Sequence, residues 1–393
     1  TPYSVTFTPT DSANYATATT TVTLTVSAAP LVEPTIITPP SASDITYGQT
    51  LAASNLTGGL AQYDGSTVDG VFDWTNSSIK PSVSDSGTTE FNVTFTPNDP
   101  LTYSSVNVKV KVTVNQAAQT ITVTTHAPAS AVYNNSFTVA ATASSGLTVT
   151  YSSGSTGICS VSGATFTMLT GTGTCVVQYD QAGNDNYSAA TRITENVTAA
   201  KAAQTITVTT HAPASAVYNN SFTVAATASS GLTVTYSSGS TGICSVSGAT
   251  FTMLTGTGTC VVQYDQAGND NYSAATRVTE NVTAAKAAQT ITVTTPAPAS
   301  AIYNNTFTVA GTASSGLAVA YSSGSPSICS VSGATFTMLS GTGTCVVQYD
   351  QEGNDNYSAA TRITENVTAA KAAQTITVTT HAPASAVYNN SFT

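Results

Sequence analysis

The sequence predicts an all-β chain of tandem antiparallel β-sandwich modules, and three observations support this. A unit of 85 residues is repeated, apolar residues alternate with Thr or Ser within each unit, and cysteines occur in pairs at a fixed spacing. The repeat is marked by the segment AAQTITVTT, which begins at Ala117, Ala202 and Ala287 and again at Ala372. Self-similarity at a fixed period is the signature of a repeat architecture, so we expect one folded module for each unit.

The repeat divides most of the chain into modules. The complete units are copy 1 (117–201), copy 2 (202–286) and copy 3 (287–371), and 372–393 is the N-terminal part of a further repeat. Copies 1 and 2 differ at a single position. The length of each unit is ordinary for a sandwich domain that folds independently.

The residues before copy 1 share a landmark with the copies. A Val, an aromatic residue two positions later and a Tyr eight positions after that end at Tyr15, Tyr103 and Tyr187. This alignment makes 1–30 the C-terminal part of a truncated module and 31–116 a complete module of a second type. Both ends then fall within modules, so we expect a segment of a longer repetitive protein. Head-to-tail complementation of the two end fragments is disfavoured, because together they are shorter than one module.

Copy 1 contains seven short runs in which apolar residues occupy every second position, as in a strand with one buried face. Gly, Pro, Asn and Ser separate the runs, and no window shows helical periodicity. Seven such strands predict two antiparallel sheets packed face to face, an immunoglobulin-like sandwich with Thr on its outer faces. The inward-facing residues are expected at Ile121 and Val123, Phe137 to Ala141, Leu147 to Tyr151, Ile158 and Val161, Phe166 and Met168, Cys175 to Tyr179, and Ile193 and Val197.

Glu195 is the residue that fits this pattern least well. It lies midway between Ile193 and Val197, so in a regular strand its side chain faces the core together with theirs. A β-bulge or an edge position would remove the conflict, and we expect one of the two here.

The cysteines fall as one pair in each copy, 16 positions apart. This spacing predicts one disulfide per module, closing a loop of about 15 residues and stabilising the module by about 3 kcal/mol. Buried free thiols, crosslinks between copies and a metal site are alternatives, although a metal is disfavoured without CxxC or a nearby His. Disulfides form in oxidising compartments, hence outside the cell. The predicted pairs are Cys159–Cys175, Cys244–Cys260 and Cys329–Cys345.

Charge is scarce in this chain: only 7% of the residues are charged, and the formal net charge is −10. An acidic chain lacks the basic face that nucleic-acid binding requires. No stretch approaches the roughly 18 consecutive apolar residues of a membrane-spanning helix. Half of the net charge belongs to 31–116, with eight acids and three bases, whereas copy 1 has a net charge of −1. We therefore expect a nearly neutral repeated body, with 31–116 as the place for more specific binding.

No residue pattern predicts catalysis or a cofactor. The histidine of copy 1, His126, is replaced by Pro296 in copy 3, and no GxSxG motif is present. Asp64, Asp69 and Asp73 cluster in 31–116. Their Asp-Gly pairs are stronger signals for turns than for acid–base chemistry. We therefore expect a protein that is not an enzyme.

The loop DQAGNDN is the one candidate for a metal site. Asp180, Asn184 and Asp185 offer oxygen ligands to Ca²⁺, but the bidentate Glu and the DxDxDG spacing are missing. In a sandwich, this loop lies near the N-terminal end of its module and faces the preceding module, where an ion would stiffen the chain. The alternative is a turn with Asx hydrogen bonds, in which Tyr187 plugs the end of the sandwich.

Longer segments carry a family resemblance. The copies contain APASAVYNNSFTVAATASSGLTVTYSS, the cysteine pair and QAGNDNYSAAT, and they resemble the Ig-like repeats of large bacterial surface proteins of the adhesin type. The module 31–116, with ITYGQTLAASNLTGG, GVFDW and VTFTPNDPLTY, is similar to another repeat type of such proteins. The resemblance implies an Ig-like fold and a place at the cell surface. Such modules serve as stalks, spacers and sometimes ligand-binding tips.

These features predict a non-enzymatic extracellular structural protein, a stalk or fibre of Ig-like modules at or outside the cell surface. Its partners would be the neighbouring modules and other copies in a filament, while a surface ligand is not indicated. Two alternatives stay open: an array of ligand- or glycan-binding modules, and the spacer region of an enzyme whose catalytic domain lies elsewhere. The joints read TAAKAAQT, without Pro or Gly, so we expect short linkers and limited bending.

Overall fold

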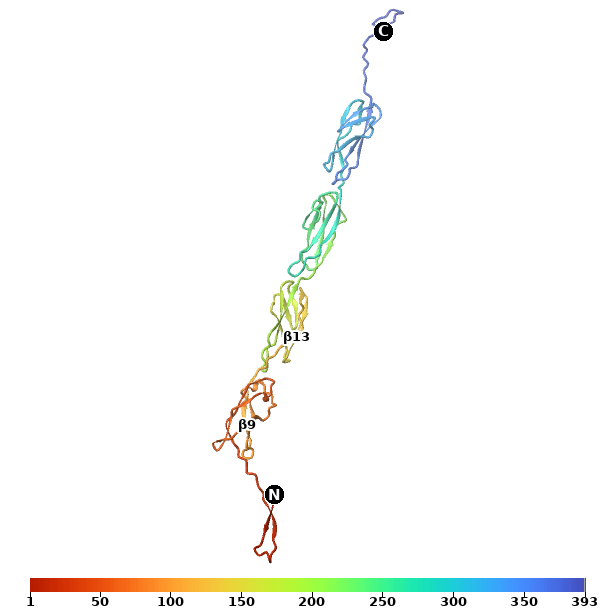
Figure 1. The fold of residues 1–393 in the computed structure, drawn as a ribbon. Coiled ribbons are helices and arrows are strands. Elements are labelled where there is room, and N and C mark those ends of the chain that lie inside the picture. The colour runs from red at the N-terminus through yellow and green to blue at the C-terminus, as the bar shows by residue number, and fades with distance from the viewer. Residues whose placement is uncertain (392) are drawn as a thin grey trace. The chain divides into compact units, whose positions relative to one another are not determined.

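The structure is a computed structural model that describes residues 1–391 and 393 (Figure 1). The chain forms two compact units, Thr1–Ala200 and Lys201–Thr393. Strands hold 47% of the residues and helices 2%, and the helices are the 3-10 turns η1 (Leu51–Ala53) and η2 (Val83–Asp85). The prediction of an all-β chain is therefore confirmed.

Copy 1 contains nine strands, two more than its alternation pattern predicts. β14 has no counterpart in the predicted runs, and the run through Val139 is divided between β15 and β16. The same nine recur in copy 2 from β22 (Ile206–Thr210) to β30 (Val278–Ala285), and in copy 3 from β31 (Ile291–Thr295) to β39 (Ile363–Ala370). The strands of copy 1 are β13 (Ile121–Thr125), β14 (Ser130–Val132), β15 (Ser136–Thr138), β16 (Ala140–Ala143), β17 (Thr150–Ser153), β18 (Cys159–Ser162), β19 (Thr165–Met168), β20 (Thr174–Asp180) and β21 (Ile193–Ala200).

The strands of copy 1 are arranged as an Ig-like sandwich. β14, β21, β20 and β17 form a four-stranded sheet in this order, β15, β19 and β18 form a three-stranded sheet, and β13 pairs with β16. The pairs are antiparallel except β14 with β21, where the start of the module runs parallel to its last strand. Pro128 lies between β13 and β14. Because proline has no amide hydrogen for a ladder, the chain breaks there and changes from one sheet to the other.

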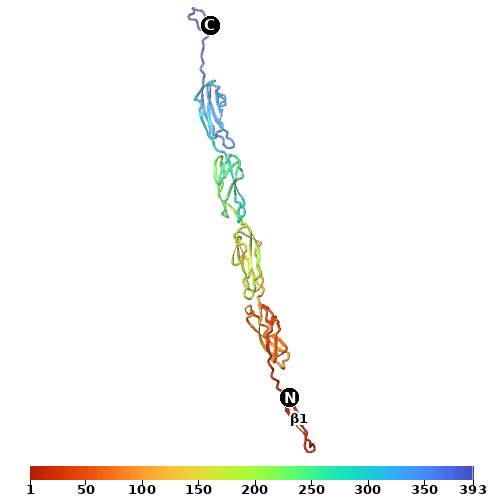
Figure 2. The same cartoon turned by 90° about the vertical axis from the view of Figure 1, so that its left-hand side faces the viewer.

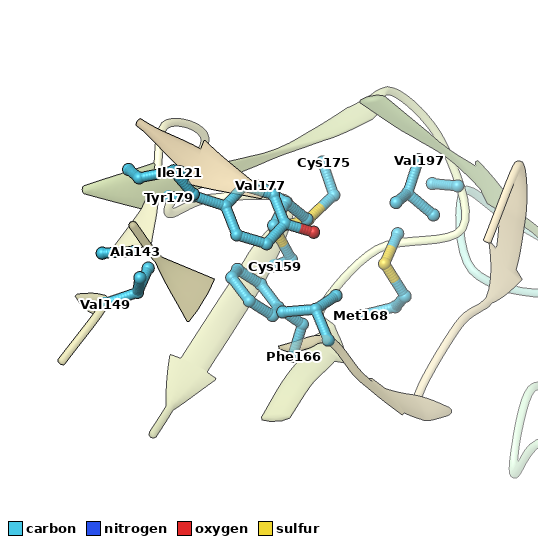
Figure 3. Close-up of a cluster of buried hydrophobic side chains, with 12 residues drawn as sticks. Ile121, Ala143, Val149, Cys159, Phe166, Met168, Cys175, Val177, Tyr179 and Val197 are labelled. Carbon is cyan, nitrogen blue, oxygen red and sulfur yellow. A yellow bond between two sulfur atoms is a disulfide. The ribbon is translucent and has the colours of Figure 1, made fainter. Parts of the chain in front are cut away.

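The core of copy 1 lies between these sheets (Figure 3). Phe166 of β19 shares one buried cluster with Val177 and Tyr179 of β20 and with Val197 of β21, and all four residues are 0% exposed. Their alternate spacing in the sequence directs these side chains to one face of each strand. Burying each such apolar side chain contributes about 1.5–3 kcal/mol.

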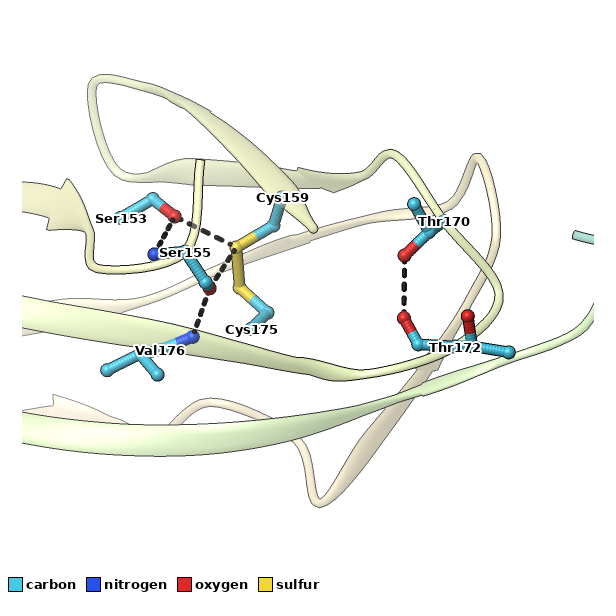
Figure 4. Close-up of a disulfide and its surroundings, with 7 residues drawn as sticks. All are labelled: Ser153, Ser155, Cys159, Thr170, Thr172, Cys175 and Val176. Atoms are coloured by element: carbon cyan, nitrogen blue, oxygen red, sulfur yellow. Dashed lines mark hydrogen bonds between the residues drawn. A yellow bond between two sulfur atoms is a disulfide. The ribbon is translucent and has the colours of Figure 1, made fainter. Parts of the chain in front are cut away.

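A disulfide connects the two sheets of each copy. In copy 1, Cys159 of β18 is bonded to Cys175 of β20, with Cα atoms 5.6 Å apart (Figure 4). The hydroxyls of Ser153 and Ser155 lie 3.2 and 3.8 Å from the Cys159 sulfur, and Ser155 Oγ accepts a hydrogen bond from the Val176 amide at 2.8 Å. The other copies contain the bonds Cys244–Cys260 and Cys329–Cys345, so all three disulfides are the pairs that the sequence predicts.

The module 31–116 is also built from strands, but its sheets differ. β11, β10 and β9 form one three-stranded sheet and β3, β7 and β8 another, while β12 pairs with β5 and β4 with β6. The indole of Trp74 packs against the buried cluster around Phe91 and donates to the Ser54 carbonyl at 3.0 Å. The strands are β3 (Thr35–Thr38), β4 (Ser41–Ala42), β5 (Ile45–Thr46), β6 (Leu56–Thr57), β7 (Leu60–Tyr63), β8 (Ser66–Thr67), β9 (Gly70–Trp74), β10 (Glu90–Pro97), β11 (Val106–Lys111) and β12 (Val114–Asn115).

The first residues form an antiparallel hairpin of β1 (Pro2–Phe7) and β2 (Ala18–Thr23), drawn in red in Figure 2. Every residue of these two strands is exposed. The described residues after β39 contain no strand. Throughout the described part of the chain, no helix has the length and apolar character needed to cross a membrane.

Candidate functional site

Glu195 lies in a regular stretch of β21. It is opposite Val177 of β20 in a ladder whose register does not shift, whereas β14 pairs only with residues 198–200 of β21. Glu195 therefore has a ladder partner on one side only, which is the expected edge position, and no β-bulge is present there. The register shift in copy 1 lies elsewhere, between Val123 and Thr125 of β13. Hydrogen bonds rather than a backbone irregularity accommodate the acid.

Three groups surround the carboxylate of Glu195, whose side chain is 21% exposed. The hydroxyl of Tyr179 donates to Oε2 at 2.5 Å, and the amide of Ala127 donates to the same oxygen at 2.9 Å. The exposed ring of His126 places Nδ1 2.5 Å from Oε1. A carboxylate bound in this way avoids most of the cost of burying an unpaired charge.

Copy 3 shows that the cluster does not require histidine. Pro296 replaces the histidine, and Glu365 still accepts from the Tyr349 hydroxyl at 2.6 Å and from the Ala297 amide at 2.8 Å. The tyrosine at this position is 0% exposed in every copy. We therefore assign the cluster to the stability of the sandwich rather than to acid–base chemistry.

The same contacts shift the ionisation of both partners. Burial raises the pKa of Tyr179 far above its ordinary value, and the neighbouring Glu195 raises it further. Burial also disfavours the charged form of Glu195, but hydrogen bonds from Ala127, Tyr179 and His126 outweigh it and lower the pKa of this carboxyl. At neutral pH the pair is a neutral donor and a charged acceptor.

Two of the three side chains proposed for calcium, those of Asp180 and Asn184, take part in contacts within copy 1, and the third, Asp185, is exposed. Asp180 Oδ1 accepts from Arg192 Nε at 2.7 Å. Asn184 Oδ1 accepts from the amides of Asn186 and Tyr187 at 3.0 and 2.9 Å, which is an Asx turn. Within residues 1–391 and 393, no group of three or more His, Cys, Asp or Glu side chains is placed to hold a metal ion.

The segment 181–188, which we name the Asn–Tyr loop of copy 1, is fixed at both ends by one buried amide. Gln119, 6% exposed, donates from Nε2 to Gln181 Oε1 at 2.5 Å and to the Ser188 carbonyl at 2.7 Å. The corresponding Asn–Tyr loop of copy 3, 351–358, is held in the same way by Gln289. The two loops are thus firmly attached to their own modules.

A glycine makes the close turn of the loop possible. Gly183 has a φ of 79°, and a Cβ atom there would lie 2.3 Å from the Tyr187 carbonyl oxygen. Any other residue would meet both a strained backbone and a clash. The turn presents Asn186 and Tyr187 at the end of the module.

In the unit Thr1–Ala200, the Asn–Tyr loop contacts the preceding module. Asn186 Oδ1 accepts from the amide of Val83, the first residue of η2, at 3.1 Å. The ring of Tyr187 meets Tyr47 edge-on, with centroids 5.3 Å apart and planes at 79°. The loop faces its predecessor as predicted. Tyr187, which was expected to plug its own sandwich, packs against the neighbouring module.

In the unit Lys201–Thr393, the loop of copy 3 makes the same two contacts with copy 2. Asn356 Oδ1 accepts from the Gly256 amide at 3.1 Å, and Tyr357 meets Tyr218 edge-on at 5.5 Å and 78°. Edge-on aromatic pairs contribute about 0.5–1.5 kcal/mol beyond their burial. The same Asn and Tyr therefore bind two modules of different sequence, a role that sequence reasoning did not assign to them.

The close approach of the Asn–Tyr loop of copy 3 explains why residue 256 of copy 2 is a glycine. A Cβ atom on Gly256 would lie 2.6 Å from the Asp355 carbonyl oxygen and 3.0 Å from the Asn356 Cα. Gly256 does not have a positive φ, so its own backbone does not demand glycine. At the corresponding Gly341 of copy 3, the nearest atoms all belong to Lys371, at 3.2 Å or more.

The remaining sequence candidates lie apart from this joint. Asp64 and Gly65 both have positive φ and form the tight turn between β7 and β8. Asp69 follows β8 and Asp73 lies within β9, and all three acids are exposed. We assign Asp64 to the turn.

Three tyrosines that recur in each copy, and that a glycan-binding surface could use, are engaged in packing in copy 1. Tyr179 is fully buried, and the hydroxyl of Tyr151 accepts from the Ala141 amide at 3.0 Å. Tyr187 packs on Tyr47. The aromatic pairs of copy 1 therefore support the sandwich and its joint.

No family model matches this chain, and no curated protein matches it. Among solved structures, it is similar to Drosophila N-cadherin EC1-4, with 9% identity over 79% of this chain and 94% of that chain, at a TM-score of 0.22. The surface layer protein SbsC, domains 1-6, shows 11% identity over 86% of this chain and 55% of that chain, at 0.21. The I-band fragment I67-I69 from titin shows 10% identity over 64% and 99%, at 0.29. At such TM-scores the fold assignment rests on the strand topology described above.

Proposed function

We propose that the protein is a non-enzymatic, extracellular structural protein, a stalk or fibre of Ig-like modules. A place on the surface of a bacterial cell, as in proteins of the adhesin type, follows from the resemblance of its repeats. The main support is the recurring joint, in which the Asn side chain of the Asn–Tyr loop accepts a hydrogen bond from the preceding module and the Tyr ring forms an aromatic pair with it. Contacts of this kind restrict the bending of neighbouring modules.

The disulfides support the same proposal. Each copy holds one fully buried disulfide between its two sheets, and such bonds persist in oxidising compartments outside the cell. An extended protein at the cell surface must resist unfolding without the reducing and chaperone systems of the cytosol. The disulfides and the buried Tyr–Glu pairs supply such resistance within each module.

Small-angle X-ray scattering of the full chain tests the structural role. If the joints restrict bending, the maximum dimension and cross-section should fit a stiff row of modules. Alanine at the Asn and Tyr of the loop in all three copies should then shorten the average dimension without loss of strand content in circular dichroism. A wild-type chain that already scatters as freely jointed modules would contradict the proposal.

A matched control exists in the loop of copy 3. Glu352 is exposed, and copies 1 and 2 have Ala at this position. Glu352→Ala should leave the scattering profile unchanged. The extracellular location is tested separately by antibody labelling of intact producing cells, and labelling only after lysis would contradict it.

A further inference from the structure

The far end of copy 3 carries a pocket of about 490 Å³. Its lining includes Tyr303, Leu339, Gly341 and Lys371. Tyr303 is 47% exposed and Leu339 is also 47% exposed. A tyrosine ring, an apolar side chain and a glycine backbone thus line a hollow that is also bordered by hydroxyl residues, by Lys371 and by Gln374.

The corresponding surface in copy 2 is occupied. Tyr303 and Gly341 match Tyr218 and Gly256, each 85 positions earlier. In copy 2 this tyrosine meets the ring of Tyr357, and this glycine donates its amide to the Asn356 side chain. Gly256 is buried and Tyr218 is half-buried, whereas Gly341 is half-buried and Tyr303 is exposed.

We propose that the pocket of copy 3 is a docking site for the Asn–Tyr loop of another module of the same repeat. The Asn side chain would accept a hydrogen bond from the Gly341 amide, and the Tyr ring would pack edge-on against Tyr303. Because the pocket is already present in copy 3 without a loop in it, docking requires little reorganisation of copy 3. This inference rests on the joint between copies 2 and 3 described above. It concerns a different surface, the far end of copy 3, which takes no part in that joint.

The loop and the pocket lie at opposite ends of a module, so their contact is head to tail. Such a heterologous interface does not close on itself in a pair and can be repeated without limit. The partner that fits this pocket is therefore another module of the repeat, which presents an unbound Asn–Tyr loop at its N-terminal end. Gly341 and Tyr303 favour a loop that carries an Asn–Tyr pair. A larger side chain in place of Gly341 would fill the space that the loop needs.

Hydrogen exchange at the Gly341 amide tests the proposal. The full chain is lengthened by a segment identical to 224–286, which completes the repeat that begins at Ala372. Mass spectrometry can follow Gly341 separately, because Ser340 distinguishes its peptide from those of the other copies, which have Thr at this position. The exchange of Gly341 should slow severalfold relative to the 393-residue chain. Formation of the added disulfide, seen by mass, shows that the new copy has folded.

Two variants of the lengthened chain complete the experiment. Alanine at the added residue that corresponds to Asn356 should restore fast exchange at Gly341. Alanine at the preceding, exposed Asp should leave the exchange slow. Fast exchange of Gly341 in a lengthened chain with a folded added copy would overturn the proposal. This result would leave the proposed structural role intact, because the scattering experiment measures bending at other joints of the chain.

Discussion

The hydroxyl of Tyr179 donates to Oε2 of Glu195 at 2.5 Å, and this places an acid between a fully buried tyrosine and a main-chain amide. The same pair is formed by Tyr264 with Glu280 and by Tyr349 with Glu365. A polar pair at the same core position in each copy has consequences for stability that can be measured copy by copy.

Removing the hydroxyl should destabilise copy 1. Tyr179→Phe leaves Glu195 with the Ala127 amide and His126, and loss of one bond to a partly buried carboxylate costs about 1–3 kcal/mol. Tyr349→Phe should cost more, because Glu365 keeps only the Ala297 amide. Hydrogen exchange of β20 and of β38 (Thr344–Asp350) measures both effects, since these strands carry the substitutions and their peptides change in mass. Equal protection in wild type and Tyr179→Phe would show that the bond contributes nothing.

The raised pKa of these tyrosines predicts a loss of stability at alkaline pH. Their folded-state pKa lies above the ordinary value of about 10. Their contribution is therefore complete below pH 10 and is lost as the pH rises toward the folded-state pKa. Ultraviolet titration should show that three of the 18 tyrosines ionise only together with unfolding. Ionisation of every tyrosine near pH 10 in a folded chain would refute this.

The disulfide of copy 1 should be resistant to reduction and important for stability. Both of its cysteines are 0% exposed, so a reductant reaches them only when the module opens. Replacing Cys159 and Cys175 together by Ala should lower the free energy of unfolding of this copy by about 3 kcal/mol. Urea unfolding followed by limited proteolysis measures the change.

Loss of the disulfides should also increase misassembly. Nearly identical neighbouring modules can exchange strands during refolding, and a bond within each module penalises this. Refolding under reducing conditions should give more swapped oligomers in size-exclusion chromatography. Unchanged refolding yield and size would count against the idea.

The joint between copies 2 and 3 should be sensitive to a single methyl group. Gly256→Ala places a Cβ atom 2.6 Å from the Asp355 carbonyl oxygen, so the loop of copy 3 must move away and the bond to Asn356 weakens. Gly341→Ala is the matched control, because its close neighbours belong only to Lys371. Crosslinking or scattering should report a looser joint for the first variant alone. Identical behaviour of the two variants would argue against a tight contact.

Calcium removal should leave the protein unchanged. Asp180 is paired with Arg192, and Asn184 is used in an Asx turn of its own loop. The melting temperature should therefore be the same with EDTA and with added calcium. Asp185→Ala should likewise not alter the response to a chelator. A melting temperature that falls in EDTA would restore the metal hypothesis.

Much of the fold could be predicted because its signals are local or repeated. The alternation of apolar residues through β20 placed Cys175, Val177 and Tyr179 on one face, and all three are buried. The fixed cysteine spacing identified each disulfide. Strand number was underestimated by two for two reasons. β14, which follows Pro128, is only three residues long and too short for an alternation pattern, and one predicted run is divided between β15 and β16.

The Asn–Tyr loop of copy 1 shows which features the sequence could predict and which it could not. Its sequence indicated an Asx turn at the end of the module that faces its predecessor, and Tyr187 already stood out as the landmark of every module. The pairing of Asn186 with Val83 could not be predicted, because the two residues are 103 positions apart. The tyrosine partner Tyr47 is still farther away along the chain and belongs to a module of another type.

The sequence by itself determined the all-β class, the module length, the cysteine pairs and the scarcity of charge, since these follow from periodicity and composition. Only the tertiary structure decided that Glu195 stays in a regular strand with Tyr179 and Ala127 as its donors. It also decided that Gly256 must be small and that Asn356 binds it from 100 positions away. The reason is physical. A hydrogen bond or a clash depends on the distance between two atoms after folding, and the alternation of apolar and polar residues along the chain does not determine that distance.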